Sequence, residues 1–368
     1  MKNLLPKKNN KYIRNPNIDF LRINGMLAIV IHHLIYHGKI IDKYPKFHKQ
    51  VYSLDILCFW HVNSFGLISG LVGNNKHKFS SLFYLWILVE FYSILFHFIY
   101  NKYNDSKYTK NIFYILYPVI HRQYWYFTCY FGMYPFLRFI NLGILNIASI
   151  EFKKSIYFMI GIFIFWSSYY KDQFGQNSGY SPFSLLILYI IGAYTLNYFL
   201  HNFNRLYRLL ICFVSCITFI LSSIVCYNIN KNNWFSKNAK IKKIFRAGIN
   251  SFPMIIQAVS ITMFISQLKF NKYLSRIITF IGPLTFDVYI IHENPYIRNI
   301  YIKTIFNNLS INFKLLDIYL LFIRKSIYIF FICVFIAYIR NIIFKIIKIK
   351  KLCEFFETTT TIIINHCL

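Results

Sequence analysis

The chain has 368 residues, of which 57% are hydrophobic and 21% aromatic, and it carries a formal net charge of +29. Its mean hydropathy of +0.43 is too high for an ordinary soluble domain. The apolar residues also gather in blocks of about 20 residues, which are long enough to cross a bilayer. The positive charge does not indicate nucleic-acid binding, since the lysines fall mostly in loops between these blocks and form no contiguous basic face. Solvated loops that meet lipid headgroups explain them.

The pattern of apolar blocks predicts an all-α, polytopic transmembrane helical bundle of about ten spans. A polar segment (1–18) precedes the membrane-embedded domain (19–346), and a tail (347–368) follows it. The polar segment lacks the apolar core of a signal peptide, so we expect the first span to be retained as an anchor. Asn15-Pro16 marks its start, with Asn as the cap and Pro at the first helical position. The predicted spans lie at 19–37, 55–73, 79–100, 124–145, 155–170, 183–200, 207–228, 249–268, 277–292 and 317–346.

The charge of the loops favours a cytoplasmic N-terminus only narrowly, because loop 229–248, on the opposite side, is also rich in lysine. We predict a multi-pass protein of the cell or plasma membrane with its N-terminus in the cytoplasm. The fifth and ninth spans are short, and the ninth contains Pro283, so either is a candidate for a broken or re-entrant helix.

The first span carries ionisable residues on one face. Arg22 and His33 are eleven residues apart, which on a helix brings them within about 20° of each other and roughly 16 Å apart along the axis. Asp19 and His37 share this face, and His32 points elsewhere. Two interpretations stay open: an interfacial Asp–Arg pair with a packing histidine, or a functional face, which is the default for ionisable groups inside a membrane.

The second span, DILCFWHVNSFGLISGLVG, contains the polar residues His61 and Asn63, which need partners inside a membrane. Gly66 and Gly70 form a GxxxG pattern, which predicts close approach of another helix. We interpret His61 as a candidate wall of the same cavity as His33.

Two later segments could also contribute to a site. Tyr124 and Trp125 begin the fourth span, where periodicity alone favours a belt at the membrane surface. The loop KDQFGQNSGYSP (171–182) is turn-like, as ligand-binding loops often are.

The ninth span, FIGPLTFDVYIIHENPYIR, brings Asp287, His292 and Glu293 together at a helix end before Pro295. These residues predict either a helix cap or a second polar wall of the cavity, and we favour the wall.

The eight cysteines lie mostly inside apolar runs, without a CxxC pair or a disulfide-type spacing. They predict small core residues. We expect no metal site.

In several of these segments the chain resembles the acyltransferase-3 family of integral membrane acyltransferases, especially the bacterial members that O-acetylate polysaccharides. The first span fits the family's Arg-x10-His motif as Arg22 to His33. Four further segments resemble the family in the expected order, over roughly residues 15–345. They are HVNSFGLISGLVG, QYWYFTCYFGMYPFL, GYSPFSLLILYIIGAY and FDVYIIHENPYIR. Lys76 and Lys78 stand where many members have an Arg-x-x-Arg pair.

The resemblance implies transfer of an acyl group, usually acetyl from acetyl-CoA, to a sugar hydroxyl of a surface polysaccharide or glycolipid. His33 is then the catalytic base, acting directly or through an acyl-enzyme, and His292 and Glu293 orient the base or the acceptor. Arg22 would bind a CoA phosphate. Asp19, His61, Asn63, Tyr124, Trp125 and Asp287 are the candidates for the substrate cavity. The implied partners are the acyl-CoA donor, a glycan acceptor and the bilayer, with no permanently bound cofactor.

Two alternatives remain from the residues. A transporter or flippase for a lipid-linked glycan also uses intramembrane His, Asp and Glu, although we find no internal repeat of the kind common in transporters. A family member that has lost catalysis is the other alternative.

Overall fold

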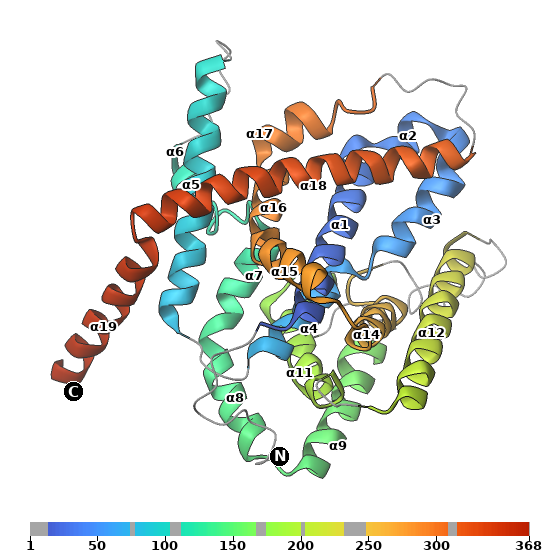
Figure 1. The fold of residues 1–368 in the computed structure, drawn as a ribbon, viewed down its shortest axis with the longest axis horizontal. Helices are drawn as coiled ribbons and strands as arrows, with labels where there is room; N and C mark the ends of the chain where they lie inside the picture. The colour runs from blue at the N-terminus through green and yellow to red at the C-terminus, as the bar shows by residue number, and fades with distance from the viewer. Residues whose placement is uncertain are drawn as a thin grey trace.

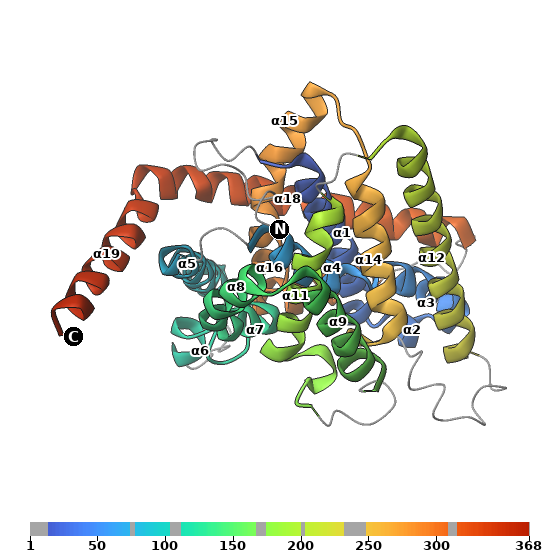
Figure 2. The ribbon, with the colours of Figure 1, turned by 90° about the horizontal axis from the view of Figure 1, so that it is seen from below.

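The computed structural model describes residues 14–73, 78–103, 112–166, 174–199, 203–231, 248–307 and 315–367. Within these ranges all regular structure is helical, as predicted, and the helices pack into one bundle (Figures 1 and 2). The α-helices are α1 Pro16–Gly38, α2 Ile40–Lys43, α3 His48–Cys58, α4 His61–Val72, α5 Phe79–Tyr103, α6 Ile112–Leu116, α7 Trp125–Met133, α8 Leu137–Asn146, α9 Ser149–Met159, α11 Pro182–Phe199, α12 Arg205–Lys231, α14 Phe252–Ser266, α15 Lys272–Ile281, α16 Thr285–His292, α17 Pro295–Ile297, α18 Leu315–Ile346 and α19 Ile349–Cys367.

Six helical segments in the described ranges are long and apolar enough to cross a membrane, and two shorter apolar helices accompany them. The prediction of about ten spans is therefore not confirmed. The six are Pro16–Gly38, Pro45–Val72, Phe79–Lys102, Arg205–Ile229, Lys272–His292 and Leu316–Ile346; the shorter two are Pro182–Thr195 and Phe252–Ser266.

Two of the predicted spans, at 124–145 and 155–170, have no counterpart among these eight helices, and both are interrupted. The span at 124–145 is divided into α7, the 3-10 turn η3 (Tyr134–Phe136) and α8, because Pro135 cannot donate a backbone hydrogen bond. The span at 155–170 continues from α9 into a π-helix, η4 (Ile160–Trp166). Its last four residues lie outside the described part of the chain.

Helix α1 lies in the interior of the bundle in both views (Figures 1 and 2) and packs against α3, α4, α14, α15, α16 and α18. Its predicted start is confirmed, since the Asn15 side chain accepts a hydrogen bond from the Asn17 backbone N–H and Pro16 is the first helical residue. It ends at Lys39, which has a left-handed backbone conformation. Helix α1 is therefore surrounded by other helices along most of its length.

Helices α4 and α11 approach each other as closely as the GxxxG pattern predicts. A Cβ atom on Gly70 would lie 2.0 Å from the Tyr189 carbonyl oxygen, and one on Gly192 would lie 2.1 Å from the Leu67 carbonyl oxygen. Only glycine fits at these two positions, so the two backbones touch and hold α4 in place beside α1.

The predicted break in the ninth span is confirmed. The 3-10 turn η7 (Gly282–Leu284) separates α15 from α16, because Pro283 interrupts the hydrogen-bond ladder. Asn294 then caps the short α17, and the π-helix η8 (Arg298–Ile302) follows. This arrangement places the end of α16 against the C-terminal part of α1, at His33 and His37.

The C-terminal tail, unassigned from the sequence, forms α19. It leaves the bundle beyond α18 and runs beside the first part of α5 (Figures 1 and 2). The Glu357 carboxylate accepts hydrogen bonds from the backbone N–H groups of Phe79 and Ser80, at 2.9 and 3.2 Å. It thereby caps the N-terminus of α5, where a negative charge is stabilising.

Candidate active site

A cavity of about 680 Å³ lies between α1, α4, α7 and α16. Six residues of α1 line it. Ile18 is one, and the other five are spaced alternately by three and four positions, which places them on one helix face: Asp19, Arg22, Met26, Ile29 and His33. Eleven residues of α-helix separate Arg22 from His33 by roughly 16 Å along the axis. The same cavity therefore contains the arginine and the histidine that the sequence paired.

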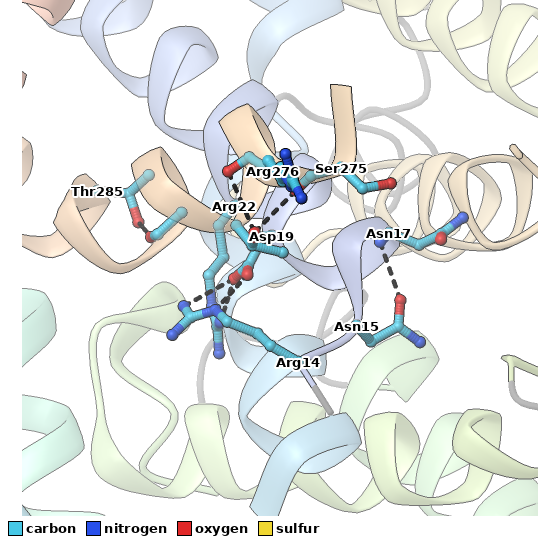
Figure 3. Close-up of polar contacts among 10 residues, drawn as sticks. Arg14, Asn15, Asn17, Asp19, Arg22, Ser275, Arg276 and Thr285 are labelled. Atoms are coloured by element: carbon cyan, nitrogen blue, oxygen red, sulfur yellow. Dashed lines mark hydrogen bonds and ion pairs between the residues drawn. The ribbon is translucent and has the colours of Figure 1, made fainter. Parts of the chain in front are cut away.

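An arginine cluster, which we define as Arg14, Asp19 and Arg22, lines one part of this cavity. The Asp19 carboxylate is completely buried and accepts a hydrogen bond from Arg22 Nη1 at 2.7 Å. Arg14 donates to the same carboxylate from Nη2, at 2.9 Å, and from Nε. Figure 3 shows both guanidinium groups converging on it. The predicted Asp19–Arg22 pair is present, and a second arginine shares it.

Sequence analysis did not single out Arg14. It lies before the first apolar block, in the segment read as polar and solvated, and its only signal was its position two residues before the helix start. The turn of about 100° per residue, which relates side chains along a helix, could not predict where Arg14 lies, because Arg14 precedes α1.

Asp19 is held by the backbone of the turn that follows α15. A Cβ atom on Gly282 would lie 2.5 Å from both Cβ and Cγ of Asp19, so a larger residue there would displace the carboxylate. The absence of a side chain at Gly282 thus gives the carboxylate its space, and the carboxylate in turn positions the two arginines.

A histidine network, which we define as His33, His37, His292 and Glu293, lies further along α1. His33 Nδ1 is 2.8 Å from His292 Nε2 and 2.9 Å from Glu293 Oε1. His292 Nδ1 is 2.5 Å from the Val288 carbonyl oxygen. The structure therefore brings His33 together with two residues that lie about 260 positions further along the chain.

The hydrogen bonds assign the tautomers of the two rings. A carbonyl oxygen only accepts, so the Nδ1 atom of His292 carries a proton and donates it to Val288. In neutral His292, Nε2 is then an acceptor, and His33 Nδ1–H donates toward it and toward Glu293. The ring nitrogen of His33 that can accept a proton is therefore Nε2, and His33 lines the cavity.

Glu293 is shared by several donors. Its Oε1 atom accepts from His37 Nε2 at 2.9 Å as well as from His33, and its Oε2 atom accepts from Arg298 Nη1 at 3.2 Å. A carboxylate with this many donors stays ionised, and it stabilises an imidazolium on His33 when that ring takes a proton.

One ligand atom each from His33, His292 and Glu293 lie within 4.8 Å of one another, so the three could hold a metal ion. Their closest separations, 2.8 and 2.9 Å, are hydrogen-bond lengths. Adjacent ligands on a tetrahedral zinc ion with bonds of about 2.0 Å are roughly 3.3 Å apart. The hydrogen-bonded network fits this geometry better than a metal site does.

The aromatic segment that starts α7 belongs to the site. Tyr124 is completely buried and accepts a hydrogen bond from Asn294 at 3.1 Å, which a residue of a membrane-surface belt would not do. Trp125 lines the cavity, and its ring lies 4.5 Å from that of Tyr180 in the loop before α11. Burial raises the pKa of the Tyr180 phenol, and the nearby Tyr36 adds to the shift. The phenol is therefore neutral at physiological pH.

Four predicted cavity residues do not line the cavity: the buried Tyr124 and three polar residues, His61, Asn63 and Asp287. His61 packs against His32, with ring centroids 5.1 Å apart, and Asn63 donates to the Ile249 carbonyl oxygen at 2.7 Å. Asp287 is paired with Arg340, far from solvent. The expected partners are therefore present for the Asn63 amide nitrogen and for Asp287. Neither ring nitrogen of His61 has a hydrogen-bond partner among the described residues, and its contacts are with the rings packed around it.

Comparison with known proteins assigns the chain to a family. Residues 15–345, nearly the whole chain, match the acyltransferase-3 family, which is described as an acyltransferase domain. No curated protein and no solved structure matches the chain. Because the family model covers nearly the whole chain and six of the described helices are long and apolar enough to cross a membrane, the chain belongs to the acyltransferase-3 family and is a membrane acyltransferase.

Proposed function

We propose that the protein transfers an acetyl group from acetyl-CoA to a sugar hydroxyl of a cell-surface polysaccharide or glycolipid. One observation carries this proposal: a single cavity follows one face of α1 from the guanidinium of Arg22 to the imidazole of His33. An acyl-CoA has the matching shape, with phosphates at one end of an extended arm and a thioester at the other.

Arg22 is the donor anchor in this proposal. Its guanidinium is always charged, is 23% exposed and matches phosphate oxygens in a two-pronged geometry. The intervening cavity residues Met26 and Ile29 are apolar and would line the path of the arm.

His33 is the general base. Its Nε2 atom takes the proton from the sugar hydroxyl as the oxygen attacks the thioester carbonyl, and the C–S bond of the tetrahedral intermediate then breaks. His33 returns the proton to the departing CoA thiolate. Glu293 and His292 act as positioning residues, because they fix the Nδ1–H tautomer and stabilise the transient imidazolium.

The acceptor would approach past the aromatic residues near His33. Trp125 and Tyr180 form an open aromatic pair, with Tyr180 45% exposed, and Tyr36 is 69% exposed beside His37. Aromatic side chains with a polar edge suit a sugar ring, which has both apolar C–H faces and hydroxyls.

The test measures acetyl transfer from radiolabelled acetyl-CoA to surface glycan isolated from the producing cells and freed of acetyl groups by alkali. We expect His33→Ala to lower kcat by about 100-fold or more, since general-base catalysis contributes that much. His121→Ala, at an exposed histidine outside the cavity, is the matched control. Full activity in His33→Ala membranes would reject the mechanism, and glycan movement without acetyl transfer would favour a transporter.

A further inference from the structure

Arg14 lies at the entrance of α1 and immediately before the residues matched by the family. Its side chain is 41% exposed, yet it lines the same cavity as Arg22 and His33. Two of its N–H groups bind the buried Asp19 carboxylate. Arg14 is thus a partly solvated cation with a fixed orientation.

The arginine cluster has an excess of positive charge. Both guanidiniums are always protonated, whereas Asp19 supplies one negative charge. Among the described residues that line the cavity, Asp19 is the sole acidic one. A carboxylate that served only to neutralise Arg22 would not need a second cation, so the cluster is suited to take a further anion.

The geometry also limits the kind of anion. Asp19 Oδ1 accepts from Arg22 Nη1 and from Arg14 Nη2, at 2.7 and 2.9 Å, so the two guanidiniums meet at one oxygen (Figure 3). A guanidinium has five N–H donors, and Arg22 uses one of them on Asp19. The remaining donors of two adjacent guanidiniums match an anion with several oxygens, which is the chemistry of phosphate.

Resting on the function proposed above, we infer that Arg14 is a second donor-binding residue, and that Arg14 and Arg22 together bind the phosphates of a CoA-type donor. Asp19 is the positioning residue that holds the pair. The headgroup of an anionic phospholipid offers the same phosphate chemistry, so the experiment must separate the two sources.

The experiment compares three donors in the glycan assay: acetyl-CoA, S-acetyl-4′-phosphopantetheine and S-acetylpantetheine. These carry the full set of phosphates, one phosphate and none. We expect the wild type to prefer acetyl-CoA, and Arg14→Ala to reduce that preference over S-acetylpantetheine by about 10-fold or more, the effect of losing a charged hydrogen bond. The loss should appear in the KM for acetyl-CoA, and Arg14→Lys should restore part of it.

Arg276→Ala is the matched control, because Arg276 is exposed near the same end of α1 and does not line the cavity (Figure 3). Its donor preference should equal that of the wild type. The thermal unfolding temperature of each variant in detergent separates loss of binding from loss of folding.

Three results would decide against the inference in different ways. If Arg14→Ala lowered kcat/KM equally for all three donors, Arg14 would have a structural or lipid-binding role. If the wild type did not distinguish acetyl-CoA from S-acetylpantetheine, the arginine cluster would bind no donor phosphate. If the wild type transferred acetyl from none of the three, the proposed function itself would be wrong.

Discussion

Two buried aspartates in this protein bind arginine, and their surroundings differ. Asp287 on α16 pairs with Arg340 on α18, which is itself 5% exposed, and accepts a further hydrogen bond from Tyr92 at 2.8 Å. Asp19 on α1 is equally buried, but its partners Arg14 and Arg22 are 41% and 23% exposed. One aspartate is sealed with a single counter-charge, and the other is shared by two arginines that face a cavity.

The difference shows that burial of an acid inside a membrane protein does not by itself identify a functional site. Sequence analysis treated Asp19 and Asp287 alike as cavity candidates, because each is a carboxylate in an apolar span. The structure separates them by the exposure and number of their partners. The balanced pair joins helices, and the unbalanced cluster leaves charge available to a ligand.

The largest expected effect is on stability, at the sealed pair. Asp287→Ala leaves Arg340 buried without its counter-charge, which costs about 3–5 kcal/mol of unfolding free energy. Asp19→Ala should cost less, because Arg14 and Arg22 retain access to water. Thermal unfolding in detergent measures both. An equal or larger loss in Asp19→Ala would break the comparison.

Removing each cluster as a unit should sharpen the comparison through activity. The triple variant Asp287→Leu/Arg340→Met/Tyr92→Phe replaces the sealed polar groups by apolar ones, which is often neutral for stability. We expect it to fold and to transfer acetyl groups. The double variant Asp19→Leu/Arg22→Met should fold but lose at least about 10-fold in kcat/KM for acetyl-CoA. If the triple variant lost acetyl transfer and the double variant kept it, the distinction between the two aspartates would be wrong.

The smallest effect is expected where the charge is unchanged and only the position of Asp19 moves. Gly282→Ala places a Cβ 2.5 Å from Asp19 Cγ, so the carboxylate must shift, at a cost of about 1–3 kcal/mol. We expect the KM for acetyl-CoA to rise. Gly143→Ala is the control, since a Cβ there meets nothing within 4 Å. An unchanged KM in Gly282→Ala would show that the arginines do not depend on this contact.

The features that sequence analysis predicted depend on local or periodic physics. The cap at Asn15, the break at Pro283 and the shared face of Arg22 and His33 each follow from the preferences or the turn angle of a helix. The close contact at Gly70 followed from small residues at a fixed spacing.

What could not be predicted depends on how distant segments meet. His33 and Glu293 are far apart in sequence, and only the packing of α16 on α1 brings them to 2.9 Å. His61 has the same local character as His33, but it faces His32 instead of the cavity. The prediction of about ten spans is not confirmed, because apolar length does not reveal an interruption such as η3, where Pro135 divides the segment.

The placement of Arg22 and His33 on one continuous helix has a consequence for how this site can change. Each inserted or deleted residue between them would rotate one relative to the other by about 100° and remove it from the cavity. Only changes close to whole turns, about three or four residues, would preserve the shared face, and each would alter the separation by about 5 Å. The distance between the guanidinium and the imidazole along this cavity is therefore adjustable in discrete steps and not gradually.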